Sequence, residues 1–217
     1  HPIPRRQRQM CIRDRWCQRT HTRIQGASVL VRFASLGSGS RGNGSIVASQ
    51  TTILLVDCGF QYKEALARLK RLRLDPEDLD GILVTHEHSD HVSGVEALAN
   101  KHSIPVYASR GTWIEIGIDR FDKSVHISGL FSIGDIDISP VTVPHDAREP
   151  LQFVFQCEGT RLGILSDLGS MSPRVIEHYQ DLDAISVEFN HDLELLQKGP
   201  YPAFLKTRVS GDFGHLN

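Results

Sequence analysis

The densest group of potential metal ligands in this 217-residue chain directly follows a short apolar run. The run predicts a buried strand that ends at Thr85, and three histidines and one aspartate follow within six positions. In extended backbone, residues two apart point to the same side, so His86 and His88 can hold one ion together. Asp90 and His91 fall where the chain turns toward the next helix, and they suit a second ion. Two ions about 4 Å apart can bridge one hydroxide and bind both oxygens of a displacement reaction, so the pattern predicts a two-metal hydrolytic centre.

The elements that must position these side chains alternate between strands and helices from residue 29 onward. A glycine-rich turn over 37–44 separates the first two strands, and Pro140 indicates an edge or a bulge in a later one. No repeat of 20 to 50 residues is present, so a solenoid is excluded. The order predicts a mixed α/β fold in two halves. The predicted strands are 29–33, 53–56, 82–84, 104–107, 136–143, 151–157, 162–165 and 184–187, and the predicted helices are 62–72, 95–98, 113–118, 173–179 and 192–196.

The motif His-x-His-x-Asp-His after a short apolar strand resembles the signature of the metallo-β-lactamase fold. The resemblance covers residues 29–217 and implies an αββα sandwich with metals at the strand ends. Three further motifs resemble the same family. In Leu-Leu-Val-Asp-Cys-Gly, Asp57 would brace the metal loop without binding metal. In Val-Pro-His-Asp, His145 matches the next ligand, and in Ile-Leu-Ser-Asp-Leu-Gly, Asp167 matches the aspartate that bridges both ions.

Two late motifs, Val-Glu-Phe-Asn-His-Asp and Gly-His-Leu-Asn, resemble the YycJ/WalJ subgroup. These are bacterial members related to the tRNA-processing and phosphodiesterase branches, and nuclease activity on DNA ends is attributed to them. The resemblance implies that His215, aligned by Glu188, donates a proton to the leaving oxygen. His191 either shares that role or packs the pocket. Asp90 counts among the catalytic groups as well as among the metal ligands.

The sequence departs from the family pattern near its end. The family has a final metal-binding histidine beyond the position of His215, whereas this sequence stops at Asn217. Either His215 is itself that last ligand, or the last ligand and the closing helix and strand are absent and the sequence is a fragment. The order of the motifs favours the fragment. A missing closing strand would leave an unpaired sheet edge and exposed apolar surface.

Charge is unevenly distributed along the chain. Residues 1–28 carry seven arginines and one aspartate, which leaves a net charge of −8 on the rest of a chain whose total is −2. The leader has no helical or strand period, so it is either a nucleic-acid arm or, the favoured interpretation, a disordered or foreign extension. The acidic body would bind nucleic acid only through local patches such as 68–73, or through a homodimer surface. A solvated helix face is the simpler interpretation of 68–73.

Composition limits the class of protein. With 40% hydrophobic and 23% charged residues, the chain is neither disordered nor collagen-like. It contains no apolar run of about 20 residues and no signal peptide, which predicts a cytoplasmic protein without a membrane segment. The cysteines Cys11, Cys17, Cys58 and Cys157 have neither zinc-finger nor disulfide-scaffold spacing, and they are expected to be reduced and mostly buried.

The expected function is a two-metal phosphodiester hydrolase, a DNA exonuclease that uses a metal-bridged hydroxide, with DNA favoured over RNA. Ligands without thiolate accept zinc or manganese, and the subgroup resemblance favours manganese. One alternative is another hydrolase on the same site: a lactonase, a thioesterase or a β-lactamase. The motifs around Glu188 and His215 argue against it. The other is an inactive scaffold or fragment. The intact set of His86, His88, Asp90 and His91 argues against a scaffold that has lost its metals, whereas loss of the last ligand would favour an inactive fragment.

Overall fold

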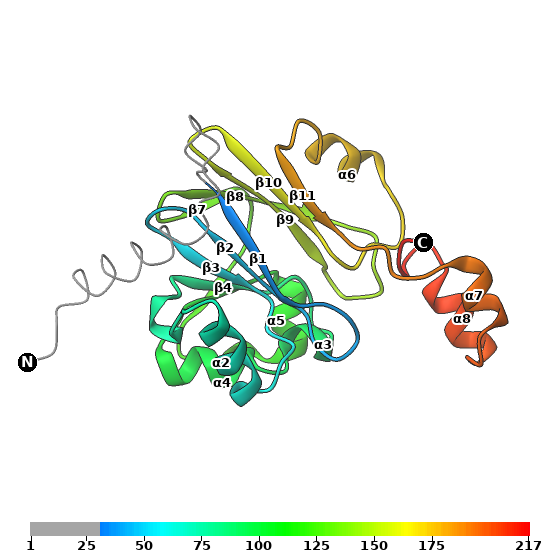
Figure 1. The fold of residues 1–217 in the computed structure, drawn as a ribbon, viewed down its shortest axis with the longest axis horizontal. Helices are drawn as coiled ribbons and strands as arrows, with labels where there is room; N and C mark the ends of the chain where they lie inside the picture. Colours follow the sequence, from blue (N-terminus) through cyan, green and yellow to red (C-terminus); the bar gives the residue numbers. More distant parts are fainter. Residues whose placement is uncertain (1–30) are drawn as a thin grey trace, which may run out of the picture.

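Two β-sheets packed face to face form the centre of the molecule, and helices cover the outer face of each sheet (Figure 1). The computed structural model describes residues 31–217. The αββα sandwich expected from the sequence is confirmed. The predictions for residues 1–28, including Cys11 and Cys17, and for the first two residues of the first strand lie outside the described residues.

The first sheet carries the strand that precedes the histidine motif. Its strands β1, β2 and β3 pair antiparallel, whereas β3, β4, β5 and β6 pair in parallel. Parallel strands bring their carboxyl ends to one edge of a sheet, and the loop that follows β4 opens at that edge. In sheet order, the strands are β1 (Arg32–Gly37), β2 (Gly44–Ala48), β3 (Ile53–Val56), β4 (Gly81–Leu83), β5 (Val106–Ala108) and β6 (Ser124–His126).

The second sheet is antiparallel except for its last pair, β10 with β11. β7 pairs with β8 only as far as Ile138, so β8 has no neighbour on that side at Pro140. Proline has no N–H to donate, and the open edge accommodates it as the sequence predicted. In sheet order, the strands are β11 (Ala184–Val187), β10 (Thr160–Leu165), β9 (Leu151–Cys157), β8 (Ile136–Thr142) and β7 (Phe131–Ile133).

Three apolar clusters hold the four layers together. β3 is buried on both faces: Ile53 and Leu55 pack toward the helices of the first layer, whereas Leu54 and Val56 pack between the sheets. This double burial explains why the strand is uninterruptedly apolar. A third cluster includes Val175 and lies between the second sheet and α6. The helices are α2 (Tyr62–Arg71), α3 (Ser89–Val92), α4 (Val95–His102), α5 (Arg110–Ile116), α6 (Pro173–His178), α7 (Leu193–Lys198) and α8 (Ala203–Val209), with 3₁₀ turns at Pro76–Asp78 and Ile118–Arg120.

Several elements differ from the sequence-based prediction. The strands β2, β6 and β7 and the helices α3 and α8 were not predicted, and β1 runs on into the glycine-rich turn, to Gly37. β6 is exposed along its length and has no apolar alternation, so only its parallel pairing with β5 makes it a strand. α7 and α8 project from the sandwich as a pair (Figure 1). Cys58 and Cys157 are buried and unpaired, as predicted. None of the helices within 31–217 is long and apolar enough to cross a membrane.

Candidate metal centre

The histidine motif begins in the loop after β4 and runs into α3, which contains Asp90 and His91, at the carboxyl edge of the parallel strands. The backbone N–H of Leu151 in β9 donates to the carbonyl of Thr85 at 2.9 Å, so the start of this loop is joined to the second sheet. On that sheet, the N–H of Gly169 donates to the carbonyl of Pro144 at 2.8 Å. This bond holds the loops after β8 and β10 together. Four strand ends from two sheets therefore meet at one place.

The first group of possible ligands is a cluster of three imidazoles. His86, His88 and His145 each offer a ring nitrogen, and these atoms lie within 4.8 Å of one another. The ring centroids are 4.5 to 5.1 Å apart. His86 and His145 are buried, whereas His88 is half-buried. The structure thus brings together the two histidines expected to share an ion and the histidine that the resemblance adds to them.

The second group combines His86 and His91 with Asp167, which follows β10. The Oδ2 atom of Asp167 lies 2.6 Å from Nε2 of His91 and 3.3 Å from Nε2 of His86. Asp90 lies at the rim of this group, with its Oδ2 3.7 Å from Nε2 of His91. One carboxylate therefore faces histidines from both parts of the motif. This is the position that a bridging ligand requires.

His86 provides the physical test of whether these residues fit a metal. Its Nε2 atom is buried and makes no hydrogen bond, although it faces the other possible ligands. A buried polar atom without a partner costs about 1 to 3 kcal/mol, so such an atom at the centre of a ligand cluster fits metal binding. Burial lowers the pKa of His86 well below its ordinary value, and neighbouring histidines lower it further. The imidazole is therefore neutral, which is the form that binds metal.

Asp57 is placed beneath the loop rather than among the ligand groups. It has a left-handed backbone with φ of +58°, and its carboxylate accepts hydrogen bonds from the N–H and hydroxyl of Thr85, each at 2.8 Å. The Oδ2 atom also lies 2.8 Å from Nδ1 of His91. This contact fixes the tautomer of His91 and directs its Nε2 toward Asp167. Burial lowers the pKa of His91, but Asp57 and Asp167 outweigh it and raise the pKa to about 10.

Asn43, in the glycine-rich turn, is a contact that the sequence analysis missed. Its side-chain Nδ2 donates to Oδ2 of Asp90 at 3.1 Å, and its backbone N–H donates to the Asp90 carbonyl at 2.7 Å. Gly59 allows this approach, because a Cβ there would lie 1.7 Å from the same carbonyl oxygen. The asparagine within a run of glycines was the available signal. The glycine-rich turn thus holds the metal loop in place.

The third group joins the late motifs to the site. Asp167, Glu188 and His215 form a ligand set within 4.8 Å. Nδ1 of His215 lies 3.1 Å from Oε1 of Glu188 and 3.3 Å from Oδ1 of Asp167. Hydrogen bonds to Asp167 and Glu188 raise the pKa of His215 to about 10, despite its partial burial. The ring centroids of His215 and His145 are 5.3 Å apart, so the end of the chain reaches the first ligand group.

Of the predicted catalytic and metal-binding residues, Asp90 and His191 lie outside the three ligand groups found within 31–217, and only Asp90 lies at the rim of one of them. His191 is the more isolated of the two. Both of its ring nitrogens are buried without a hydrogen bond. Sequence analysis also missed Asp146 and Arg208. Asp146 accepts from Nε2 of His88 through its carbonyl at 3.2 Å, and its carboxylate pairs with Arg208 of α8. Partial burial raises the pKa of Asp146, but Arg208 outweighs this and lowers it. The projecting α8 is therefore fastened beside His88.

Comparisons with known proteins agree with this geometry. A profile of the β-lactamase superfamily domain matches residues 52–200. The chain is 38% identical over 192 residues to exodeoxyribonuclease YycJ of Bacillus anthracis, covering 86% of this chain and 73% of the relative. It is 37% identical over 194 residues to exodeoxyribonuclease WalJ of Streptococcus pneumoniae, covering 86% and 72%.

Solved structures show the same fold at low sequence identity. The metallo-β-lactamase fold protein YhfI from Bacillus subtilis superposes with a TM-score of 0.65 and 20% identity, over 74% of this chain and 71% of that one. Zinc-bound PqqB from Methylobacterium extorquens superposes with a TM-score of 0.62 and 15% identity, over 75% and 67%. These likenesses support the fold, and the sequence relatives support the nuclease subgroup.

Proposed function

The chain belongs to the β-lactamase superfamily of metal-dependent hydrolases, and from that premise we propose that it is a two-metal exonuclease acting on DNA. The observation that carries the proposal is the sharing of residues between the ligand groups. His86 belongs to the first and second groups, and Asp167 belongs to the second and third. Such sharing supports two neighbouring ions rather than separate sites. The preference for DNA over RNA rests on the two exodeoxyribonuclease relatives.

In this proposal, the side chains divide into two ligand sets. His86, His88 and His145 would hold one ion, Asp90 and His91 would hold the other, and Asp167 would be a ligand of both. When bound, two divalent ions supply a water of lowered pKa and stabilise negative charge on the phosphate. The set contains imidazole and carboxylate but no thiolate, so it suits manganese as well as zinc, with manganese favoured by the subgroup.

His215 has the contacts that a proton donor needs. Its Nδ1 is engaged by Glu188 and Asp167, which leaves Nε2 as the ring nitrogen available to a leaving oxygen. In the absence of metal, hydrogen bonds to Asp167 and Glu188 raise the pKa of His215 to about 10, so the ring then carries a proton at neutral pH. Glu188 is itself fixed, because its Oε1 also accepts from the backbone N–H of Leu168 at 3.0 Å. We assign His215 as the general acid and Glu188 as the residue that positions it. Neither ring nitrogen of His191 has a hydrogen-bond partner within residues 31–217, and we assign it no catalytic role.

The test compares substrates on the full chain loaded with Mn²⁺ or Zn²⁺. We expect degradation of linear DNA and of bis-p-nitrophenyl phosphate, with closed circular DNA resistant because it has no end. Asp167→Ala should abolish both activities, whereas Asp119→Ala, which removes an exposed carboxylate away from the site, should retain them. Turnover of nitrocefin or a lactone without turnover of the phosphodiesters would refute the proposal. Full activity of Asp167→Ala would refute the two-metal assignment.

We also propose that the chain forms a homodimer and is cytoplasmic, as expected from the sequence. A homodimer would supply a larger basic surface to an acidic body, and light scattering on the purified chain would test it. A cytoplasmic location is consistent with reduced, buried Cys58 and Cys157.

A further inference from the structure

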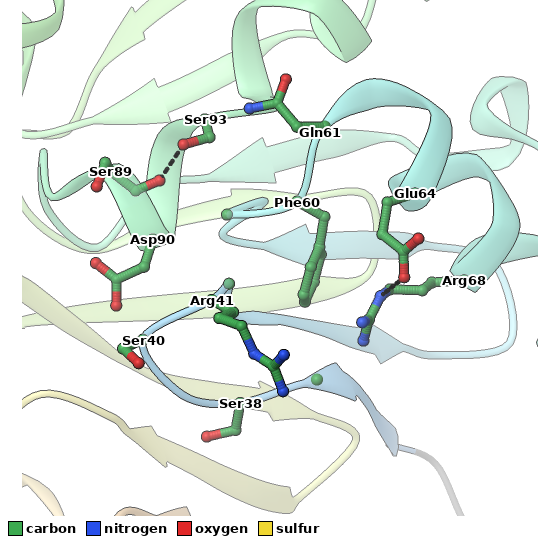
Figure 2. A pocket seen from close by; sticks show the side chains of 13 residues that line it. Ser38, Ser40, Arg41, Phe60, Gln61, Glu64, Arg68, Ser89, Asp90 and Ser93 are labelled. Carbon is green, nitrogen blue, oxygen red and sulfur yellow. Dashed lines mark hydrogen bonds and ion pairs between the residues drawn. The ribbon is translucent and has the colours of Figure 1, made fainter.

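A cavity of about 590 Å³ lies beside the candidate metal centre, between the glycine-rich turn and the start of α2 (Figure 2). Its walls are residues 37, 38 and 40–42, residues 59–61 with the first turns of α2, and the residues of α3 and its C-cap at 89, 90 and 93. Asp90 belongs both to this cavity and to the rim of the metal cluster. A ligand in the cavity would therefore lie next to whatever the metal centre binds.

The two arginines of the cavity are held differently. Arg68 is fixed by three contacts. Its Nε donates to Glu64 at 2.8 Å, and its guanidinium also donates to the Leu36 carbonyl. The guanidinium carbon lies 4.0 Å from the centroid of the Phe60 ring. Arg41 is exposed, and no hydrogen bond or ion pair is recorded for it in the part of the chain that the structure describes. Figure 2 shows the Arg41 side chain extending from the glycine-rich turn and ending below the Phe60 ring in this view.

The acidic residues of the cavity have partners of their own. Glu64 is paired with Arg68, and Asp90 is held by Asn43 and faces the metal cluster. The positive charge of Arg41 is therefore the one left without a local counter-charge. Ser38 and Ser40 also line the cavity. A guanidinium without a counter-charge can bind a phosphate group through charge-assisted hydrogen bonds.

We propose that this cavity binds a phosphate of the nucleic-acid strand other than the one being cleaved. The inference rests on the proposed function and adds a substrate contact to it. The volume lies within the range of sites for small molecules, and a phosphate held by Arg41 would lead the strand past Asp90. The cavity shape depends on the glycines of the turn, since a Cβ at Gly42 would lie 2.6 Å from the Phe60 ring.

The basic segment 68–73, which the sequence analysis named as a candidate nucleic-acid patch, lies mostly outside this cavity. Of its four cations, only Arg68 lines the cavity. Lys70, Arg71 and Arg73 are exposed and lie outside it. Arg71 is therefore a matched control for Arg41: its substitution removes the same charge from an exposed position that the proposed phosphate does not contact.

The first experiment measures binding of a fluorescent single-stranded oligonucleotide to the full chain, with EDTA present to prevent cleavage. For Arg41→Ala we expect affinity about fivefold weaker and a salt dependence whose slope falls by about 0.7, the value for one lost phosphate contact on a single strand. Arg41→Lys should retain the slope, and Arg71→Ala should match the wild type. An Arg41→Ala slope equal to that of Arg71→Ala would overturn the proposal, as would a wild-type chain that does not bind.

The second experiment separates this proposal from the proposed function. Bis-p-nitrophenyl phosphate has no neighbouring phosphate, so Arg41→Ala should hydrolyse it at the wild-type rate while losing activity on DNA. Equal loss on both substrates would place Arg41 at the metal centre and overturn the subsite. A wild-type chain that hydrolyses no phosphodiester, with the binding difference intact, would remove the proposed function and leave the subsite standing.

Oligonucleotides with and without a 5′-phosphate distinguish the two sources of the bound group. If the effect of Arg41→Ala is confined to the phosphorylated strand, the cavity holds a terminal phosphate. If both strands show it, the cavity holds an internal phosphate of the backbone. Either result supports a phosphate subsite, whereas no effect on either strand contradicts it.

Discussion

Replacing Asn43 with alanine should weaken one metal site and spare the other. The side chain donates to Oδ2 of Asp90 at 3.1 Å and accepts from the N–H of Gly39 at 2.9 Å. It does not contact the cluster of three histidines. Its Nδ2 also lies 3.0 Å from Nε2 of His91, but an ion on that nitrogen would replace this contact. In the loaded protein, Asn43 would therefore act through Asp90.

The magnitude follows from the two hydrogen bonds. A neutral hydrogen bond contributes about 0.5 to 1.5 kcal/mol and one to a charged group about 1.5 to 3, and partial exposure of Asn43 places the sum near the low end. We expect the free energy of unfolding to fall by about 2 kcal/mol. Loss of the bond to Asp90 should weaken the second ion about tenfold, which corresponds to about 1.4 kcal/mol. The first ion should keep its affinity.

A chelator-competition titration that resolves two binding steps provides the assay. Asn100→Ala is the matched control, because the Asn100 side chain likewise donates once and accepts once at a distance from the site: Nδ2 donates to the Arg120 carbonyl at 2.7 Å, and Oδ1 accepts from the N–H of Asp122 at 3.1 Å. It should lower stability to a similar extent without changing either step. Equal weakening of both ions in Asn43→Ala, or second-ion affinity within twofold of wild type, would refute the reasoning.

Two further predictions concern protons. His215→Gln should slow DNA hydrolysis about 10²- to 10⁴-fold but change bis-p-nitrophenyl phosphate turnover little, because nitrophenolate leaves without a proton. If both hydrolysis rates fall and the variant also loses metal, His215 is a metal ligand and not the proton donor. His91, with a pKa of about 10, carries a proton at pH 7 in the protein stripped of metal, and metal binding must release it. Affinity for the second ion should therefore rise about tenfold per pH unit up to about pH 10, and calorimetric heats should vary with the ionisation enthalpy of the buffer; heats independent of buffer would contradict this.

Local sequence determined the ligand types and most of the elements. The placement of three histidines and an aspartate directly after a buried strand is a local pattern, and so are the apolar runs of β3 and β9 and the turn residues between elements. These features depend on residues that are neighbours along the chain. The periodic spacing of apolar residues in helices and strands therefore allows them to be predicted from the sequence. The resemblance of the motifs added His145 and Asp167, which alone carry no distinctive signal.

Tertiary structure decided which of these residues meet. Asn43 reaches Asp90 because the turn between β1 and β2 packs on α3, and Asp146 reaches His88 because two sheets end at the same place. His191 was grouped by motif with Glu188, yet it stays outside the ligand groups within 31–217. β6 is a strand only because β5 lies beside it. Contacts between distant residues depend on how sheets and loops pack, and no local period records that packing.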